Sequence, residues 1–291
     1  ADVPPTPGLM GLSAPEPLGP DGGPLTGKMM FWFQVNEPTQ VLLLSDRQHL
    51  PNPPADIDDP SAELFLVAIT GTNGKSTTTA LIGHILKHAG RDARIGGNIG
   101  TGVLDLAPLH ANATYVLELS SYQLDLVKSL HCDVAVLLNI TPDHLDRHGG
   151  MDGYQAAKMR IFQNQTEKDV AIIGFDDVIT QSIAIGLSAN GPARVVQASS
   201  TYALGRGVSA VDGRLYDSNS GQAQFVGNLS DCMALPGRHN HQNAAAAYAA
   251  CRALGLDPQT IMDGIRTFPG LAHRLEMVGE IDGVKFVNDS K

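Results

Sequence analysis

The stretch LFLVAITGTNGKSTTTALIGHILKHAG, residues 64–90, constrains the fold of this chain more than any other. An apolar run of strand length ends in the glycine-rich sequence GTNGKST, and apolar residues with helical spacing follow it. Leu81, Ile82 and Ile85 fall on one face of that helix, and Gly90 stands where a C-terminal cap belongs. A strand, a glycine-rich turn and a helix in this order predict an α/β fold with a phosphate-binding loop (P-loop).

Further apolar runs of strand length occur at 114–119, 133–140 and 169–173, with helical patterns between them. Such alternation predicts a doubly wound, mostly parallel sheet. The sequences VSAVDGRLYD and EIDGVKFVND each place Asp-Gly between strand-like runs, which predicts two β-hairpins. The expected fold is therefore a doubly wound α/β domain with a small β-hairpin region.

Proline content divides the chain near residue 60, because twelve of the eighteen prolines precede residue 61. We treat 1–62 as a Pro/Gly-rich region that buries little surface, with candidate strands at 29–35 and 41–44. The regular α/β pattern covers 63–270, and 271–291 holds the last predicted hairpin.

Composition excludes several classes of protein. A net charge of −10 argues against a nucleic-acid partner, because phosphate backbones select basic surfaces. No apolar run is long enough to cross a membrane, and the N-terminus lacks the pattern of a signal peptide. Three cysteines without metal-like spacing predict buried free thiols in a reducing compartment. We therefore expect a cytoplasmic protein without membrane or nucleic-acid partners.

The sequence GTNGKST fits a loop that binds nucleotide phosphates. Its glycines let backbone N–H groups converge on phosphate oxygens, Lys75 would reach the β- and γ-phosphates, and Ser76 would bind Mg²⁺. Only two residues separate Gly71 from Gly74, instead of the usual four. An ordinary strand–helix turn with a chance GKS is the alternative.

Three further residues suggest a Mg²⁺–nucleotide site. Glu118 ends an apolar strand, His144 follows another, and Lys158 interrupts the apolar face of a predicted helix. Each residue also has a structural alternative. Glu118 could be a helix N-cap or a member of a buried ion pair, His144 could cap a helix, and Lys158 could be a solvated surface lysine. Together with a phosphate loop they point to metal-bridged phosphates, which need several oxygen ligands.

The chain carries a set of motifs in the order seen in one family: GTNGKST, GGNIG, ELSSYQL, LNITPDHLDRH, AAKMRIF, LPGRHNHQNAAAA, FPGLAHRLE and VNDSK. Over residues 63–291 it resembles the Mur ligases. ELSSYQL is similar to the family member that uses D-glutamate, and the short GxxGK[ST] loop is the form this family has. The resemblance implies a cytoplasmic, monomeric, ATP-dependent ligase of peptidoglycan precursor synthesis. That ligase would join D-glutamate to UDP-N-acetylmuramoyl-L-alanine (UDP-MurNAc-L-Ala) through an acyl phosphate.

The resemblance also implies roles for individual residues. Catalytic roles would fall to Lys75, Asn98, Glu118, His144, Lys158 and Arg274. ATP would be bound by Gly71, Thr72, Asn73, Gly74, Lys75, Ser76, Thr77, Asn240, Asn243, Arg274, Asp289 and Lys291. Substrate would contact Asn98 and Ser120. Two Mg²⁺ ions would be held by Ser76, Glu118, His144 and Lys158.

The family carbamylates the lysine that matches Lys158. A carbamate is an anion that can bind Mg²⁺, whereas a plain ammonium would repel it.

Compared with the three domains of that family, we expect this sequence to hold the central domain and only small parts of the other two. We expect 1–62 to be a remnant of the UDP-binding domain, 63–270 the central ATP-binding domain, and 271–291 the start of a truncated C-terminal domain. The alternatives are a truncated nucleotide-binding module without ligase activity, or another Mur or folylpolyglutamate-type ligase. A general P-loop kinase or GTPase is disfavoured, because neither an NKxD motif nor a kinase catalytic loop is present.

Overall fold

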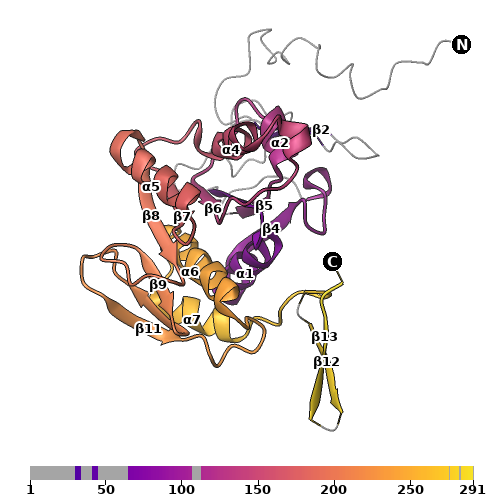
Figure 1. The fold of residues 1–291 in the computed structure, drawn as a ribbon, viewed down its shortest axis with the longest axis vertical. Helices are drawn as coiled ribbons and strands as arrows, with labels where there is room; N and C mark the ends of the chain where they lie inside the picture. Colours follow the sequence, from indigo (N-terminus) through magenta and orange to yellow (C-terminus); the bar gives the residue numbers. More distant parts are fainter. Residues whose placement is uncertain are drawn as a thin grey trace, which may run out of the picture.

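The computed structural model describes residues 30–33, 41–44, 65–106, 113–274, 276–281 and 283–290 (Figure 1). Its centre is a nine-stranded sheet of order β11-β10-β9-β8-β7-β6-β3-β5-β4. All neighbours from β4 to β9 pair in parallel, and β10 is antiparallel to both of its neighbours. The strands are β3 (Phe65–Thr70), β4 (Asp92–Gly97), β5 (Ala113–Glu118), β6 (Val134–Leu137), β7 (Val170–Gly174), β8 (Arg194–Ser199), β9 (Val208–Val211), β10 (Arg214–Asp217) and β11 (Gln224–Asn228). The predicted mostly parallel sheet is confirmed.

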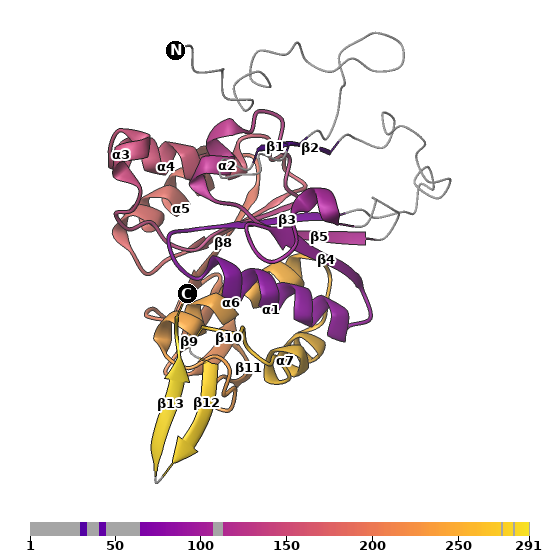
Figure 2. The same cartoon turned by 90° about the vertical axis from the view of Figure 1, so that its right-hand side faces the viewer.

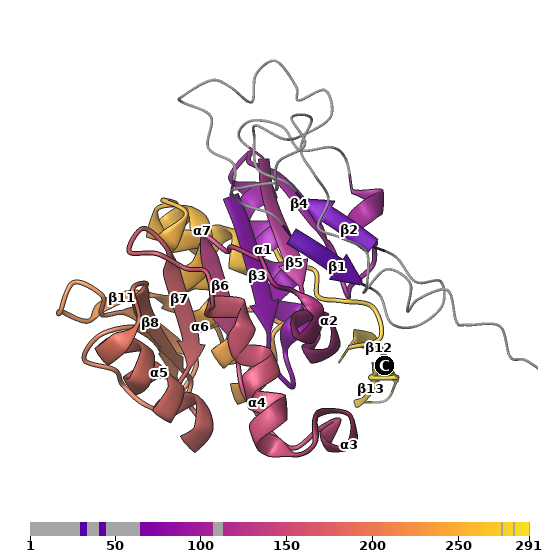
Figure 3. The same cartoon turned by 90° about the horizontal axis from the view of Figure 1, so that it is seen from above.

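Helices cover both faces of the sheet (Figures 2 and 3). One face carries α1 (Lys75–His88), α6 (Arg238–Ala253) and α7 (Pro258–Arg266), and the other carries α2 (Ser121–Leu126), α4 (Met151–Met159) and α5 (Val178–Asn190). The short helices are α3 (Leu145–His148), η2 (Val103–Asp105) and η3 (Arg160–Phe162). Each face has its own buried apolar cluster. The strands are therefore apolar on both sides, which explains their continuous hydrophobic runs.

Helix ends follow from local sequence. Gly90, with φ of 74°, comes directly after the C-cap of α1, as its position in the sequence predicts. Asp257 caps α7 by accepting a hydrogen bond from the Thr260 N–H at 3.0 Å, and Pro258 opens that helix. α1 packs on the alanine-rich α6, whose small side chains let the two helices approach closely.

The predicted hairpins are present. Asp212 and Gly213, with φ of 50° and 73°, join β9 to β10, and β12 (Glu276–Ile281) pairs with β13 (Val284–Asn288). From the proline-rich region the structure describes β1 (Met30–Phe33) and β2 (Val41–Leu44), which pair antiparallel. Cys132, Cys232 and Cys251 are all buried, as predicted.

Candidate nucleotide-binding site

The phosphate loop, residues 71–74, joins the carboxyl end of β3 to the N-terminus of α1. Ligands of open α/β sheets bind at this edge. Within the described chain no side chain caps α1. The first N–H groups of the helix are therefore available to phosphate oxygens.

Two residues of the loop region are fixed by close contacts. Gly74 has φ of 83°, and a Cβ added there would collide with Oδ1 of Asn243. The ammonium of Lys75 donates to the carbonyls of Gly71 and Thr72 at 3.1 and 2.8 Å. Burial lowers the pKa of Lys75, while the charges of Glu118 and Asp143 oppose that shift.

Lys158 lies directly beneath the loop. Its side chain is 1% exposed, and Nζ donates to the Gly71 carbonyl at 2.7 Å and lies 4.7 Å from the centre of the Tyr154 ring. Burial, with the charge of Lys75 added, lowers the pKa of Lys158 to about 7, and Asp143 opposes this. Lys158 is therefore a buried amine that is easily deprotonated, not the solvated surface lysine of the alternative interpretation.

Glu118 ends β5 and is 2% exposed. Asn98, from the turn after β4, donates its side-chain N–H to Oε1 at 3.0 Å, and its backbone N–H bonds the Glu118 carbonyl at 2.9 Å. Oε2 is buried and has no hydrogen-bond partner in the part of the chain that the structure describes. An orphaned carboxylate oxygen at this depth is costly, and a bound cation would remove that cost.

A cavity of about 500 Å³ separates the phosphate loop from the start of α6 and the segment after α7. Seven predicted ATP-binding residues line it: Asn73, Gly74, Thr77, Asn240, Asn243, Arg274 and Asp289. Arg274 also donates to the Ser76 hydroxyl at 3.3 Å. The structure thus brings together residues that lie up to 216 positions apart in the sequence. Lys291 lies outside the described residues.

His144 and Ser120 are among the predicted site residues that do not line this cavity. His144 has φ of 52°, and its side chain is 48% exposed, with Nε2 3.4 Å from Oδ2 of Asp143 and the ring edge-on to Tyr122. Ser120 caps α2 in a capping box with Gln123. Both have local structural partners, and their proposed ligands remain predictions.

Sequence reasoning missed part of the cavity wall. Asn139, Phe268 and Leu271 line it; they lie within the motifs LNITPDHLDRH and FPGLAHRLE but were given no predicted role. The position of Asn139, just after the buried strand β6, was the available signal, because ligands gather where parallel strands end.

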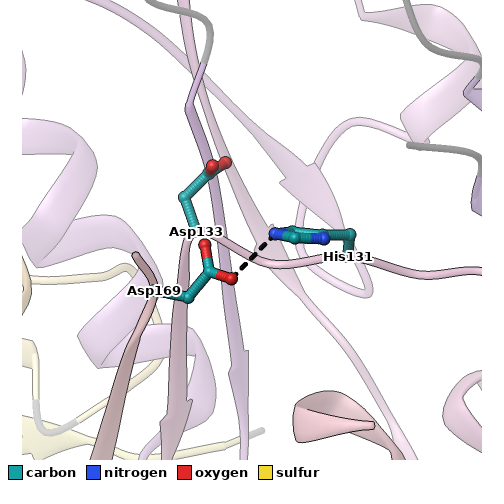
Figure 4. Close-up of side chains that lie close together, drawn as sticks. All are labelled: His131, Asp133 and Asp169. Carbon is teal, nitrogen blue, oxygen red and sulfur yellow. Dashed lines mark ion pairs between the residues drawn. The ribbon is translucent and has the colours of Figure 1, made fainter. Parts of the chain in front are cut away.

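His131, Asp133 and Asp169 form a second polar cluster, at the amino ends of the strands (Figure 4). Nε2 of His131 lies 2.9 Å from Oδ2 of Asp169, and that oxygen also accepts from the N–H and hydroxyl of Thr166. Oδ2 of Asp133 accepts from the Leu66 N–H at 2.7 Å. These bonds tie the starts of β3, β6 and β7 together, so the cluster has a structural explanation.

Residues 69–251 match the family model described as the Mur ligase middle domain. The chain belongs to the Mur ligase family. This matched segment contains the phosphate loop, Glu118, Lys158 and the start of α6, so the family assignment covers most of the cavity just described.

Curated relatives give the nearer comparison. This Mur ligase chain is 60% identical over 226 residues to the UDP-N-acetylmuramoylalanine--D-glutamate ligase of Caulobacter vibrioides, covering 78% of the chain and 48% of that relative. It is 58% identical over 230 residues to the enzyme of that name from Rhodospirillum rubrum, covering 79% and 48%. The chain spans about half the length of the curated relatives it matches.

Solved structures confirm the fold. One example is the UDP-N-acetylmuramoylalanyl-D-glutamyl-2,6-diaminopimelate--D-alanyl-D-alanyl ligase of Acinetobacter baumannii. It superposes with a TM-score of 0.58 at 24% identity, over 78% of this chain and 50% of that one.

Across the described residues, the Mur ligase chain has no helix that is long and apolar enough to span a membrane.

Proposed function

We propose that this chain is the ATP-binding part of a ligase that joins D-glutamate to UDP-MurNAc-L-Ala. One observation carries the proposal: the 500 Å³ cavity places the phosphate loop, Asn240, Asn243 and Arg274 around one space. The 60% identity to a relative named for this reaction supports the choice of substrates.

The reaction consists of two transfers. A carboxylate oxygen of UDP-MurNAc-L-Ala attacks the γ-phosphorus of ATP, the bond to ADP breaks, and an acyl phosphate forms. The amine of D-glutamate then attacks the acyl carbon, the C–O bond to phosphate breaks, and the nitrogen loses a proton. Amide and inorganic phosphate are the products. Positioning and neutralisation of charge supply most of the catalysis in such transfers.

The residues of this chain divide these tasks by position. The N–H groups at the start of α1 and the Lys75 ammonium would hold the phosphates, and Arg274, already hydrogen-bonded to Ser76, would contact them from the segment that lines the cavity after α7. Asn98 would orient the reacting carboxylate while it holds Glu118. Asn240 and Asn243 would contact the nucleoside. Ser120 would contact the substrate, and Asp289 and Lys291 would close over ATP.

One Mg²⁺ ion would be held by Glu118 and Ser76; Oε2 of Glu118, a buried oxygen without a donor among the described residues, supports this. When bound, Mg²⁺ neutralises negative charge on the transferring phosphate. A second ion would be held by His144 and Lys158. The ammonium of Lys158 does not suit a cation, but its low pKa favours the neutral amine that reacts with CO₂. We therefore propose that Lys158 is carbamylated.

Carbamylation can be measured directly. Incubation with ¹³C-labelled bicarbonate should give one protein carbamate signal in NMR spectra, absent in Lys158→Arg. At constant dissolved CO₂ the signal should grow as pH rises through about 7, where Lys158 loses its proton. A signal that survives the substitution would refute the assignment.

A chimera tests the ligase proposal. The 226 residues of the Caulobacter vibrioides enzyme that match this chain would be replaced by those of this chain. The chimera should form the amide with D-glutamate, ATP and UDP-MurNAc-L-Ala, and release one phosphate per amide. L-Glutamate in place of D-glutamate is the control.

A folded chimera that binds ATP but forms no amide would indicate a nucleotide-binding module. A chimera that prefers another amino acid or a folyl substrate would indicate another ligase of the superfamily.

A further inference from the structure

The backbone pairing of β3 with β6 continues beyond both strands into the phosphate loop. Within the sheet the last paired residues are Thr70 and Leu137. The Leu138 N–H then donates to the Thr70 carbonyl at 3.0 Å, and the Thr72 N–H donates to the Asn139 carbonyl at 2.9 Å. Two backbone hydrogen bonds thus hold the start of the loop to the end of β6.

At the next loop residue, Asn73, the hydrogen-bond partner is a side chain and not the backbone. Oδ1 of Asn139 accepts from the Asn73 N–H at 2.8 Å, and Nδ2 of Asn139 donates to the Asn73 carbonyl at 3.0 Å. The carboxamide of Asn139 therefore pairs with both backbone polar groups of one loop residue. A carboxamide has the same donor and acceptor as a peptide group, which makes this substitution possible.

The bonds to Asn139 fall on the exposed tip of the loop. Only two residues separate Gly71 from Gly74, so the loop has little chain with which to support itself. On the opposite side Gly74 packs against the side chain of Asn243. The tip is therefore fixed between Asn139 on the β6 side and Asn243 on the α6 side.

We propose that Asn139 is a positioning residue that holds the phosphate loop in the shape that binds the β- and γ-phosphates. It acts through Asn73, because both polar atoms of its carboxamide are already used by that residue's backbone. The proposal rests on the proposed ATP function of the loop.

A separate pair of hydrogen bonds links the loop to the segment that carries Asp143 and His144. Two residues after Asn139, the Thr141 N–H donates to the Thr72 hydroxyl at 3.0 Å, and that hydroxyl donates to the Thr141 carbonyl at 3.1 Å. A change at Asn139 therefore acts on the phosphate loop first and leaves the Thr72–Thr141 bonds in place.

A matched control is available in Asn164. Its Nδ2 donates to the carbonyls of Lys128 and Leu130 at 3.2 and 2.8 Å, so it too holds a surface loop through its carboxamide. Lys128 and Leu130 belong to the segment between α2 and β6, at the other end of the sheet. Asn164→Ala reports the cost of losing such bonds without touching the phosphate loop.

The test compares nucleotides with and without phosphates. Binding of MgADP, MgATP and adenosine to the 291-residue chain would be measured by calorimetry for wild type, Asn139→Ala, Asn139→Asp and Asn164→Ala. Asn139→Ala should weaken MgADP and MgATP about tenfold or more, as expected for two lost hydrogen bonds. Adenosine affinity should stay within about twofold, because Asn240 and Asn243 are unchanged. Asn139→Asp keeps only the acceptor and should also weaken MgADP, whereas Asn164→Ala should leave all three affinities unchanged.

Three results would overturn the proposal. The first is wild-type affinity for MgADP in Asn139→Ala. The second is an equal loss for adenosine and MgADP. The third is an unfolding midpoint of Asn139→Ala far below that of Asn164→Ala, because the bonds would then hold the fold and not the loop. A wild-type chain that binds neither MgADP nor MgATP would instead refute the ATP function, and this proposal with it.

Discussion

Lys75 and Lys158 share the Gly71 carbonyl as a hydrogen-bond acceptor, although they come from α1 and α4. Two ammonium groups at one carbonyl repel each other, and the charge of Lys75 is a cause of the low pKa of Lys158. This arrangement distinguishes the two lysines, since Lys75 is placed to meet phosphate and Lys158 to lose its proton.

Replacing Lys75 by alanine should abolish binding of ATP. The loop would lose its positive charge, and bonds from a charged donor to phosphate are the strong ones. We expect a loss of about 100-fold or more in affinity for MgATP by calorimetry. Lys168→Ala, on an exposed turn before β7, is the control and should bind as wild type does. If Lys75→Ala bound MgATP with unchanged affinity, the proposal that Lys75 binds the phosphates would be refuted.

Lys158 should make the free energy of unfolding depend on pH. Its pKa is about 7 in the folded chain, against an ordinary lysine value of 10.5 once the chain unfolds, so between these values the unfolded chain binds more protons. Stability from this residue should therefore rise with pH from about 7 to about 10 and be flat below 7. Urea unfolding in CO₂-free buffer at several pH values would show the rise. A variant with Lys158→Met should lack it, and an identical pH profile in both proteins would contradict the assignment.

At the scale of single elements, glycine has opposite effects in two places. Gly74 has φ of 83° against Asn243, whereas Gly186 lies within α5 with no atom within 4 Å of an added Cβ. Gly186→Ala should raise the free energy of unfolding by about 1 kcal/mol, because alanine is the better helix former. Gly74→Ala should lower it by about 1 kcal/mol or more and also weaken MgADP. Denaturant unfolding measures both, and the same sign for both would show that the backbone argument is wrong.

The sequence predicted the buried strands better than the edge strands. β3, β5, β6 and β7 are covered on both faces and appear as continuous apolar runs. By contrast β4, with the sequence DARIGG, lies at the edge and contains two charged residues and two glycines. An edge strand is paired on one side only, so its composition is less constrained and no apolar run marks it.

Site residues were predictable where their chemistry is unusual. A lysine in a glycine loop and a glutamate that ends an apolar strand stand out in the sequence, and the structure places both at one edge of the sheet. Asn139 does not stand out in the sequence, because its side chain bonds the backbone of Asn73, which lies 66 residues away in the chain. Phe268 and Leu271 lie in the motif FPGLAHRLE, but their place in the cavity wall depends on packing, which a motif does not specify.

At the scale of the whole molecule, three distant segments enclose the cavity. The phosphate loop follows β3, Asn240 and Asn243 come from the start of α6, and Arg274 comes from the segment that leads to β12. The bond from Arg274 to Ser76 spans 198 positions and joins the last segment to the first. Binding at this point therefore engages the sheet, α1 and α6 on one face, and the C-terminal segment together (Figure 2).

Ligand binding should accordingly stabilise the whole chain. MgATP at about 100 times its dissociation constant would add about 2.7 kcal/mol to the free energy of unfolding. Thermal unfolding with MgATP should show a higher midpoint in wild type and in Lys168→Ala but not in Lys75→Ala. A shift of equal size in Lys75→Ala would place the nucleotide somewhere other than the phosphate loop.

The central claim is that ATP binds between the phosphate loop and the start of α6, and an experimental structure with MgADP tests it most directly. The account predicts the phosphates beside the phosphate loop, on the N–H groups at the start of α1 and next to Lys75, with the adenosine in the cavity lined by Asn240 and Asn243. A nucleotide bound elsewhere on the chain, or phosphates that do not touch the loop, would contradict it.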